Sequence, residues 1–293
     1  MAYFDVPEIE YNRYSNRQLV AVPLAVLAVA LLVLSGSFLV YGTPVPLGMD
    51  FAGGTELTVQ TTTPADEIPS AFDEEPGVTA TSSENQYILQ FTSTDSEALR
   101  EQATDGNTGL EQDGDTEIVQ AVSSTSASFG QQSQQPALLA IAVAFVGMSA
   151  IAFLLFRTFV PSIAIVISAF SDLVIPLAFM RVTGIPLSLG TVAGLLMLIG
   201  YSVDSDILLN NHVLRRSGDF YESTYRAMRT GVTMTVTSMV AMLVMGIAAF
   251  LFGIDLLASI GTILFVGLAA DLMNTYMLNL SLLRWYKFEG VRS

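Results

Sequence analysis

The chain has 293 residues, of which 52% are hydrophobic and only 13% are charged, a composition typical of a polytopic membrane protein and not of a soluble globule. Its 27 acidic and 12 basic residues give a net charge of −15, which repels nucleic acid and excludes it as a partner. With no cysteine and one histidine, the chain has no disulfide framework and no thiolate metal site, and a zinc site is not expected.

Six segments are long and apolar enough to cross a bilayer core, which requires about 20 residues per helix. They are 18–41, 137–156, 160–180, 186–208, 232–252 and 255–283. The first follows Arg13 and Arg17 and contains the stretch 35-SGS-37, as a cleaved signal peptide would. Its apolar run continues to Tyr41, however, so we interpret it as an uncleaved membrane helix.

Basic residues indicate the orientation, because cytoplasmic segments of membrane proteins are enriched in Lys and Arg. If the N-terminus is cytoplasmic, the inner segments hold Arg13, Arg17, Arg157, Arg215, Arg216, Arg226, Arg229, Arg284, Lys287 and Arg292. The outer segments hold only Arg100 and Arg181. We therefore expect a cell-membrane protein with both termini, 1–17 and 284–293, in the cytoplasm and with residues 42–136 outside.

The outer segment 42–136 has the pattern of a small α/β domain. Four runs have the composition of strands: 55–60, 78–82, 86–92 and 116–122. Capping signals at Thr63 and Thr94 predict helices over 63–72 and 94–103, of which the first is kept short by Pro69. The order βαββαβ predicts a ferredoxin-like fold.

Acidic residues are concentrated in this outer domain, where the stretch 43–136 holds 16 Asp and Glu against the single Arg100. One interpretation is an ordinary solvated acidic surface. The other is adaptation to high salt, where screening makes dense like charge tolerable. We favour high salt, because Lys287 is the only lysine of the whole chain.

Several of the membrane helices carry carboxylates, and an Asp near the middle of a bilayer costs about 2.5–3.5 kcal/mol. The candidates are Asp172, Asp204 and Asp271, with Asp206 as a fourth. Such residues face a bundle interior or a wet cavity and handle an ion, or they make structural hydrogen bonds between helices. Asp206 stands two positions after Asp204, so the two point to different faces of the helix. Because Asp206 is closer to the cytoplasmic end, we expect it to be solvated or capping.

Four separated motifs carry a family resemblance: 48-GMDFAGGTEL-57, 171-SDLVIPL-177, 200-GYSVDSDILLNNHVLRR-216 and 226-RAMRTGVTMTVTSM-239. With one helix, one outer domain and five further helices, the chain resembles the SecF members of the SecD/SecF family, in the resistance-nodulation-division superfamily. Its acidity fits a halophilic archaeal member. Ser171 stands where the family has a histidine. In bacterial members the acid of the fourth helix stands at the position of Ser205, whereas Asp204 resembles the SecD pattern, so the register of the working carboxylate is open between Asp204 and Asp206.

The resemblance implies a subunit that assists protein export and couples an ion gradient to movement of its outer domain. The implied partners are a SecD-like subunit in a heterodimer, the Sec translocation channel, exported polypeptide chains and membrane lipid. The coupling ion is H⁺ or Na⁺, and no other cofactor is expected. Arg229 matches an arginine of the family and is our candidate for a switching ion pair with the acids.

The glycine-rich stretch after the first span forms the junction with the outer domain. Gly48, Gly53 and Gly54 can adopt positive φ and permit a sharp turn, which Asp50 could brace beside Phe51. The junction is either a joint that transmits movement or merely a tight connection.

Two other functions remain open: an ion-coupled exporter of lipids or small molecules in the same superfamily, and a non-transporting assembly factor. An enzyme is not expected, because the sequence contains no nucleophile elbow, Walker loop, metal constellation or dinucleotide fingerprint.

Overall fold

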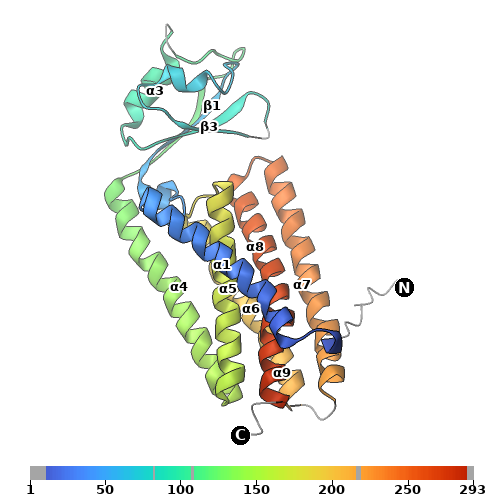
Figure 1. The fold of residues 1–293 in the computed structure, drawn as a ribbon. Coiled ribbons are helices and arrows are strands. Elements are labelled where there is room, and N and C mark those ends of the chain that lie inside the picture. The colour runs from blue at the N-terminus through green and yellow to red at the C-terminus, as the bar shows by residue number, and fades with distance from the viewer. Residues whose placement is uncertain (1–10, 82, 107–108, 216–218, 289–293) are drawn as a thin grey trace, which may run out of the picture.

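The computed structural model describes residues 11–81, 83–106, 109–215 and 219–288. It consists of a bundle of long helices and a small sheet domain that stands over one end of the bundle (Figure 1). Six helices in the described residues are long and apolar enough to cross a membrane. The predicted class, a polytopic helical membrane protein with one domain outside the bundle, is confirmed.

The spans are α1 (Asn16–Tyr41), α4 (Ala127–Phe156), α5 (Phe159–Thr183), α6 (Leu189–Arg215), α7 (Phe220–Leu251) and a composite sixth helix. The composite helix consists of α8 (Asp255–Met273), a π-helical segment η3 (Asn274–Asn279) and α9 (Leu280–Phe288). Two spans begin earlier than hydropathy predicts, α4 at Ala127 and not at 137, and α7 at Phe220 and not at 232. Both extra stretches are polar, so they extend the helices without lengthening the apolar run.

Local capping chemistry explains where several helices begin and end. Ser15 and Gln18 form a reciprocal capping box at the start of α1. Gly42, with φ 73°, ends that helix in the left-handed conformation that glycine adopts without strain. Ser126 Oγ accepts the Phe129 amide proton and starts α4.

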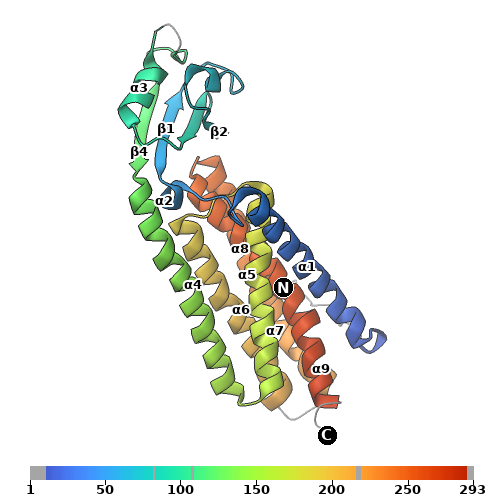
Figure 2. The ribbon, with the colours of Figure 1, turned by 60° about the vertical axis from the view of Figure 1, so that its left-hand side comes forward.

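The bundle has an interior and a periphery. In the central stretches of α5 and α6, 56% of the residues are buried within the chain, against 17% in α7 and 11% in α4. The helices α5, α6 and α8 pack against one another, while α4 and α7 lie at the outside (Figures 1 and 2). We call the end of the bundle away from the sheet, where α1 and α7 begin and α9 ends, the terminal end; Asn16, Phe220 and Phe288 mark it.

The small sheet domain corresponds to the predicted outer domain, and we keep that name for it. It contains a four-stranded antiparallel sheet in the order β2-β3-β1-β4. The strands are β1 (Gly54–Gln60), β2 (Gly77–Ala80), β3 (Gln86–Phe91) and β4 (Val119–Thr125). One face packs on helix α3 (Ser96–Thr104) around a core that includes Leu57, Leu89 and Leu99. The alternating apolar residues of β1 and β3 supply this core, as period-two patterning requires.

One predicted element of the outer domain is wrong. The run 63–72 does not form an α-helix; it contains the 3₁₀-helix η2 (Ile68–Ala71), with Pro69 in its first turn. Proline removes a backbone donor and favours such a short segment. Within the described residues, α3 is thus the one α-helix that covers the sheet.

Candidate functional site

Two polar stripes face each other inside the bundle. On α6 the stripe consists of Ser202, Ser205, Asp206 and Asn210, and on the composite helix it consists of Asp271, Asn274, Thr275 and Asn279. Each set follows the pattern i, i+3, i+4, i+8, which puts its members on one side of the helix. With Asp172 of α5 between them, these stripes form what we call the acid cluster.

Asp172 is held by hydrogen bonds from both stripes. Its Oδ2 accepts from Ser202 Oγ at 2.5 Å, and its Oδ1 accepts from Asn274 Nδ2 at 2.5 Å. The side chain is 1% exposed. The predicted position of Asp172 in the bundle interior is confirmed.

Asp271 is equally enclosed. Ser205 Oγ lies 2.8 and 2.9 Å from its two carboxylate oxygens, and Thr275 Oγ1 lies 3.3 Å from Oδ1. Ser205 occupies the register at which bacterial relatives are expected to have their acid. Here a hydroxyl fills that position, and the carboxylate approaches it from the sixth span.

Asp206 is fully buried, so the expectation that it is solvated or capping is wrong. Its Oδ1 accepts from Asn279 Nδ2 at 2.7 Å and from Thr275 Oγ1 at 3.0 Å. That expectation rested on its position along the helix. The face on which a residue lies decides its burial, and the bundle interior extends to this depth.

Asp204 lies outside the acid cluster. Its side chain is exposed on α6, on the same face as Tyr201, which is 40% exposed. The prediction that Asp204 and Asp206 point to different faces is confirmed. Arg229 is also exposed, on α7, and within the described residues it makes no ion pair with Asp172, Asp206 or Asp271.

The π-helical segment is the feature that the sequence did not predict. It places Asn274, Thr275 and Asn279 beside the carboxylates, and π-helical turns inside α-helices are frequent at functional sites. Thr275 contacts both Asp206 and Asp271 and thereby joins two of the three acids.

Most of the unpaired buried polar atoms of the described residues gather at this site. They are Ser168 Oγ, Ser171 Oγ, Asp206 Oδ2, Asn210 Oδ1, Asn274 Oδ1 and Tyr276 OH, against three elsewhere. The Ser168 hydroxyl lies beside Asp172 and Asp206 without reaching good hydrogen-bond geometry. Buried polar groups are normally paired, so side chains of the described residues alone do not satisfy the polar groups of this site.

The acid cluster has no compensating positive charge within the described residues. Three acids enclosed without a cation are costly to ionise together, and a bound proton or cation reduces that cost. The arrangement is suited to taking up and releasing a small ion.

The junction residues form a second, separate constellation at the outer end of the bundle. Gly48 N donates to Leu187 O at 2.8 Å, and Asp50 Oδ2 accepts from Leu189 N at 2.9 Å. Asp50 thereby caps α6 and ties the short helix α2 (Met49–Ala52) to it.

The other junction residues brace the chain against α4. Gln134 Nε2 donates to Phe51 O at 2.8 Å, and the Phe51 side chain is 1% exposed. Gly53 and Gly54 have φ of 76° and 124°. A Cβ on Gly53 would lie 2.6 Å from Ala127 Cα, and one on Gly54 would lie 2.1 Å from Phe91 O. Close packing as well as positive φ therefore requires glycine at both positions.

Comparison with known proteins places these features in a family. The family description "Protein export membrane protein SecD/SecF, C-terminal" matches residues 107–289, and "SecD/SecF GG Motif" matches residues 38–65. A protein-export membrane protein SecF from Haloferax volcanii is 60% identical over 292 residues, covering 99% of both chains. One from Pyrococcus furiosus is 35% identical and covers 94% of this chain and 93% of its own.

A solved structure has a similar fold. The translocon-associated membrane protein SecDF from Thermus thermophilus superposes with a TM-score of 0.73 at 20% identity. The match covers 98% of this chain but only 40% of that longer chain. The helical bundle and outer domain of this chain thus correspond in fold to 40% of that longer chain.

Proposed function

Because this chain belongs to the SecD/SecF protein-export family, we propose that it is an export subunit that couples a transmembrane ion gradient to movement of its outer domain. The observation that carries the coupling is the acid cluster, in which Asp172, Asp206 and Asp271 are buried in a membrane bundle and form no salt bridge with a basic side chain of the described residues. Intramembrane acids of this kind are costly and usually serve transport.

In the coupled cycle, H⁺ or Na⁺ enters the acid cluster from one side of the membrane and leaves on the other. An ion that neutralises the acids lets α5, α6 and the composite helix pack closely, and its release favours a different packing. Moving one charge through 100 mV supplies about 2.3 kcal/mol, enough to bias such a two-state equilibrium.

Movement reaches the outer domain through the junction. The chain passes between bundle and domain twice, at Gly54 and at Thr125, and these two residues are paired in the sheet. Because Asp50 and Gln134 tie the junction to α6 and α4, a shift between these two helices would tilt the sheet.

The proposed orientation has both termini in the cytoplasm and the sheet domain outside. It rests on the distribution of basic residues, ten on the inner side and two on the outer side. The terminal end of the bundle is then the cytoplasmic end.

A SecD-like subunit is the proposed partner within the membrane. Asp204 on α6 and the threonines Thr233 and Thr237 on α7 are exposed on the outside of the bundle. An exposed carboxylate in lipid costs about 2.5–3.5 kcal/mol. A second subunit that covers Asp204 would remove that cost. The Sec channel and exported chains complete the proposed set of partners.

The test is export of a secreted reporter by Asp172→Asn, Asp206→Asn and Asp271→Asn variants, each coexpressed with the SecD-like partner. Each variant must insert and copurify with the partner. Asp255→Asn is the matched control, since Asp255 is only half-buried at the outer start of α8. We expect export to fail in the three cluster variants and to persist in the control. Normal export in all three would favour an assembly factor instead.

A further inference from the structure

The chain segment before α1 folds back onto the terminal end of the bundle. Tyr11–Arg13 form the 3₁₀-helix η1, and Ser15 then caps α1. The Tyr11 side chain is only 6% exposed, although it precedes the first membrane helix. Burial raises the pKa of the Tyr11 phenol, which keeps the side chain neutral.

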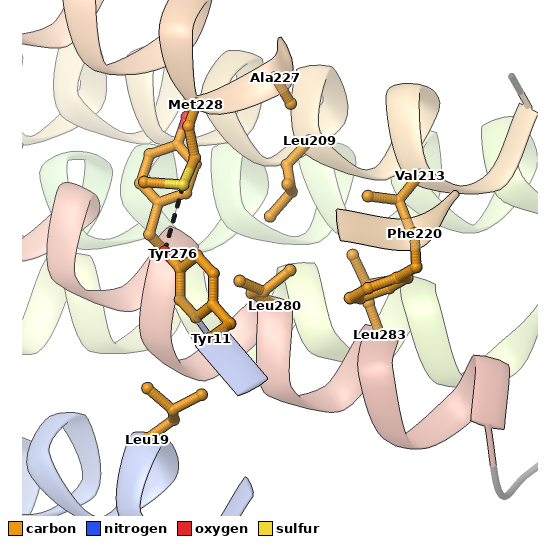
Figure 3. Packing of buried hydrophobic residues seen from close by; sticks show 10 residues of the cluster. All are labelled: Tyr11, Leu19, Leu209, Val213, Phe220, Ala227, Met228, Tyr276, Leu280 and Leu283. Carbon is orange, nitrogen blue, oxygen red and sulfur yellow. Dashed lines mark hydrogen bonds between the residues drawn. The ribbon is translucent and has the colours of Figure 1, made fainter. Parts of the chain in front are cut away.

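Tyr11 belongs to a buried apolar cluster whose other residues come from five helical elements, α1, α6, α7, η3 and α9. Figure 3 shows its ring beside Met228 of α7 and Tyr276 of η3, with Leu280 next to them. The Tyr11 hydroxyl donates to Met228 Sδ at 3.2 Å, a weak bond because a thioether is a poor acceptor. The ring therefore fills space more than it makes strong polar contacts.

Arg284 of α9 holds this segment in place. Its Nη1 donates to Tyr11 O at 3.1 Å and to Tyr14 O at 3.0 Å. Both acceptors are backbone carbonyls, so the arginine fixes the path of the chain and not a particular side chain. Hydrogen bonds from a charged donor are stronger than those from a neutral one, so these two bonds can hold a short segment in place.

The apolar layer that includes Tyr11 lies directly next to the acid cluster, on its terminal side. Tyr276 follows Thr275 in η3, and Leu280 follows Asn279, so both continue the helix that carries the cluster. Among the described residues the buried Tyr276 hydroxyl has no hydrogen-bond partner, and it lies against Gly231, where a Cβ would be 2.2 Å from it. Tyr276, covered by Tyr11, is thus one of the apolar residues that lie between the carboxylates and the terminal end, together with Leu209, Leu280 and Leu283.

Tyr11 is anchored differently from the other apolar residues that lie between the acid cluster and the terminal end. Leu209, Leu280 and Leu283 belong to long helices and are buried by them. Tyr11 belongs to the three-residue segment η1, which precedes α1 and whose Tyr11 carbonyl accepts a hydrogen bond from Arg284. If one part of this apolar layer opens while the bundle stays folded, Tyr11 is the part that can move.

We propose that the Tyr11–Ser15 segment is the cytoplasmic gate of the acid cluster, with Tyr11 as the residue that closes the passage past Tyr276 and Arg284 as its latch. The proposal rests on the proposed ion coupling and on the cytoplasmic position of the terminal end. Tyr11 is a positioning residue for this path and does not itself hold the ion.

The absence of cysteine from the chain permits a direct test. Thr275→Cys places one thiol in the acid cluster of the complex with the SecD-like partner. Its rate of reaction with a small, membrane-impermeant cationic methanethiosulfonate is measured in inside-out vesicles. We expect slow labelling with Tyr11 intact and about tenfold faster labelling after Tyr11→Ala or Arg284→Gln.

Matched variants separate opening of the gate from unfolding. Tyr14→Ala removes a side chain that is 48% exposed but keeps the carbonyl that Arg284 binds, so labelling should not change. Tyr11→Phe keeps the ring and should also label slowly. Ala169→Cys reports on a different buried cluster between α4, α5 and α6 and should stay unlabelled when Tyr11 is replaced.

Fast labelling of the Thr275→Cys protein with Tyr11 intact, or equal rates with and without Tyr11, would overturn the gate. This result is independent of export. If the ion-coupling proposal fails, export persists in the aspartate variants while the labelling rates are unaffected. If only the gate fails, export still depends on the aspartates and the labelling rates do not depend on Tyr11.

Discussion

The helical bundle and the outer domain distribute apolar and acidic residues in opposite ways. The bundle exposes apolar side chains such as Leu39, at 84%, and Phe252, at 80%, while it buries Asp172, Asp206 and Asp271. The outer domain buries Leu57 and Leu89 completely and, within its described residues, leaves its acids exposed or half-buried. The surrounding solvent explains the apolar part of this difference, since lipid accepts exposed apolar groups and water does not. It does not explain the buried acids, which are costly in either solvent.

The largest effect is expected in the core of the outer domain. Leu89→Ala should lower the free energy of unfolding of that domain by about 2–5 kcal/mol, because it leaves a cavity at a fully buried position. Limited proteolysis should then cut within 54–125 while the bundle resists. If the outer domain and the bundle became equally sensitive to the protease, this result would contradict the interpretation that they have separate hydrophobic cores.

A substitution on the outside of the bundle tests whether that surface faces lipid, in contrast to the surface of the outer domain. Val146 of α4 is 66% exposed, so in water Val146→Asp would be nearly neutral. In lipid it should cost about 2.5–3.5 kcal/mol and reduce membrane insertion. Val146→Leu is the control, and insertion of both variants at the level of the parent would show that this face is not in lipid.

A smaller effect is expected when an acid loses a donor inside the bundle. Asn279→Ala removes the 2.7 Å hydrogen bond to Asp206 and should destabilise the bundle by about 1–3 kcal/mol. Thermal unfolding of the complex in detergent measures this. Asn211→Ala, a half-buried neighbour of the stripe on α6, provides the comparison and should change the melting temperature less.

The smallest effect concerns an acid of the outer domain that has partners of its own. Glu74 accepts from Thr92 Oγ1 at 2.5 Å and from the amides of Thr92 and Ser93 at 2.7 and 3.1 Å. The hydrogen bond from the Thr92 side chain, followed by those from the backbone, lowers the pKa of Glu74.

A lowered pKa in the folded state stabilises the fold above the ordinary pKa of Glu74 and ceases to do so as the pH falls through the lowered value. Acidification should therefore reduce the melting temperature of the outer domain more in the parent than in Glu74→Gln. Glu75→Gln, at an exposed neighbour, should behave like the parent. If the melting temperatures of the parent and of Glu74→Gln had the same dependence on pH, this result would contradict a stabilising role of the ionised Glu74 carboxylate.

The positions of the membrane spans follow from the sequence, because runs of about 20 apolar residues have few alternatives. The identity of the buried acid of α6 did not follow as directly. The depth of each residue along the helix favoured Asp204, whereas the structure buries Asp206. The polar residues Ser202, Asp206 and Asn210 recur every four positions, and this periodicity was the signal for the face of α6 that is turned to the bundle interior. The outer sheet was predictable from alternation, but Pro69 makes the first helical run too short for an α-helix.

Other features had no such signal. The π-helical segment η3 depends on packing between helices, since 274-NTYMLN-279 is compatible with an ordinary α-helix. The burial of Tyr11 depends on Met228 and Arg284, more than 200 residues away in the chain. Contacts over such distances are set by the assembled bundle and cannot be inferred from local pattern.

The most direct test compares the two faces of α6 in one experiment. Export of a secreted reporter is measured in membrane vesicles, with the ion gradient intact and with it collapsed, for Asp206→Asn and Asp204→Asn complexes. We predict that Asp206→Asn abolishes the gradient-dependent part of export, while Asp204→Asn weakens association with the partner but keeps the dependence on the gradient. Gradient-dependent export in Asp206→Asn at the level of the parent would contradict the assignment of ion coupling to the acid cluster.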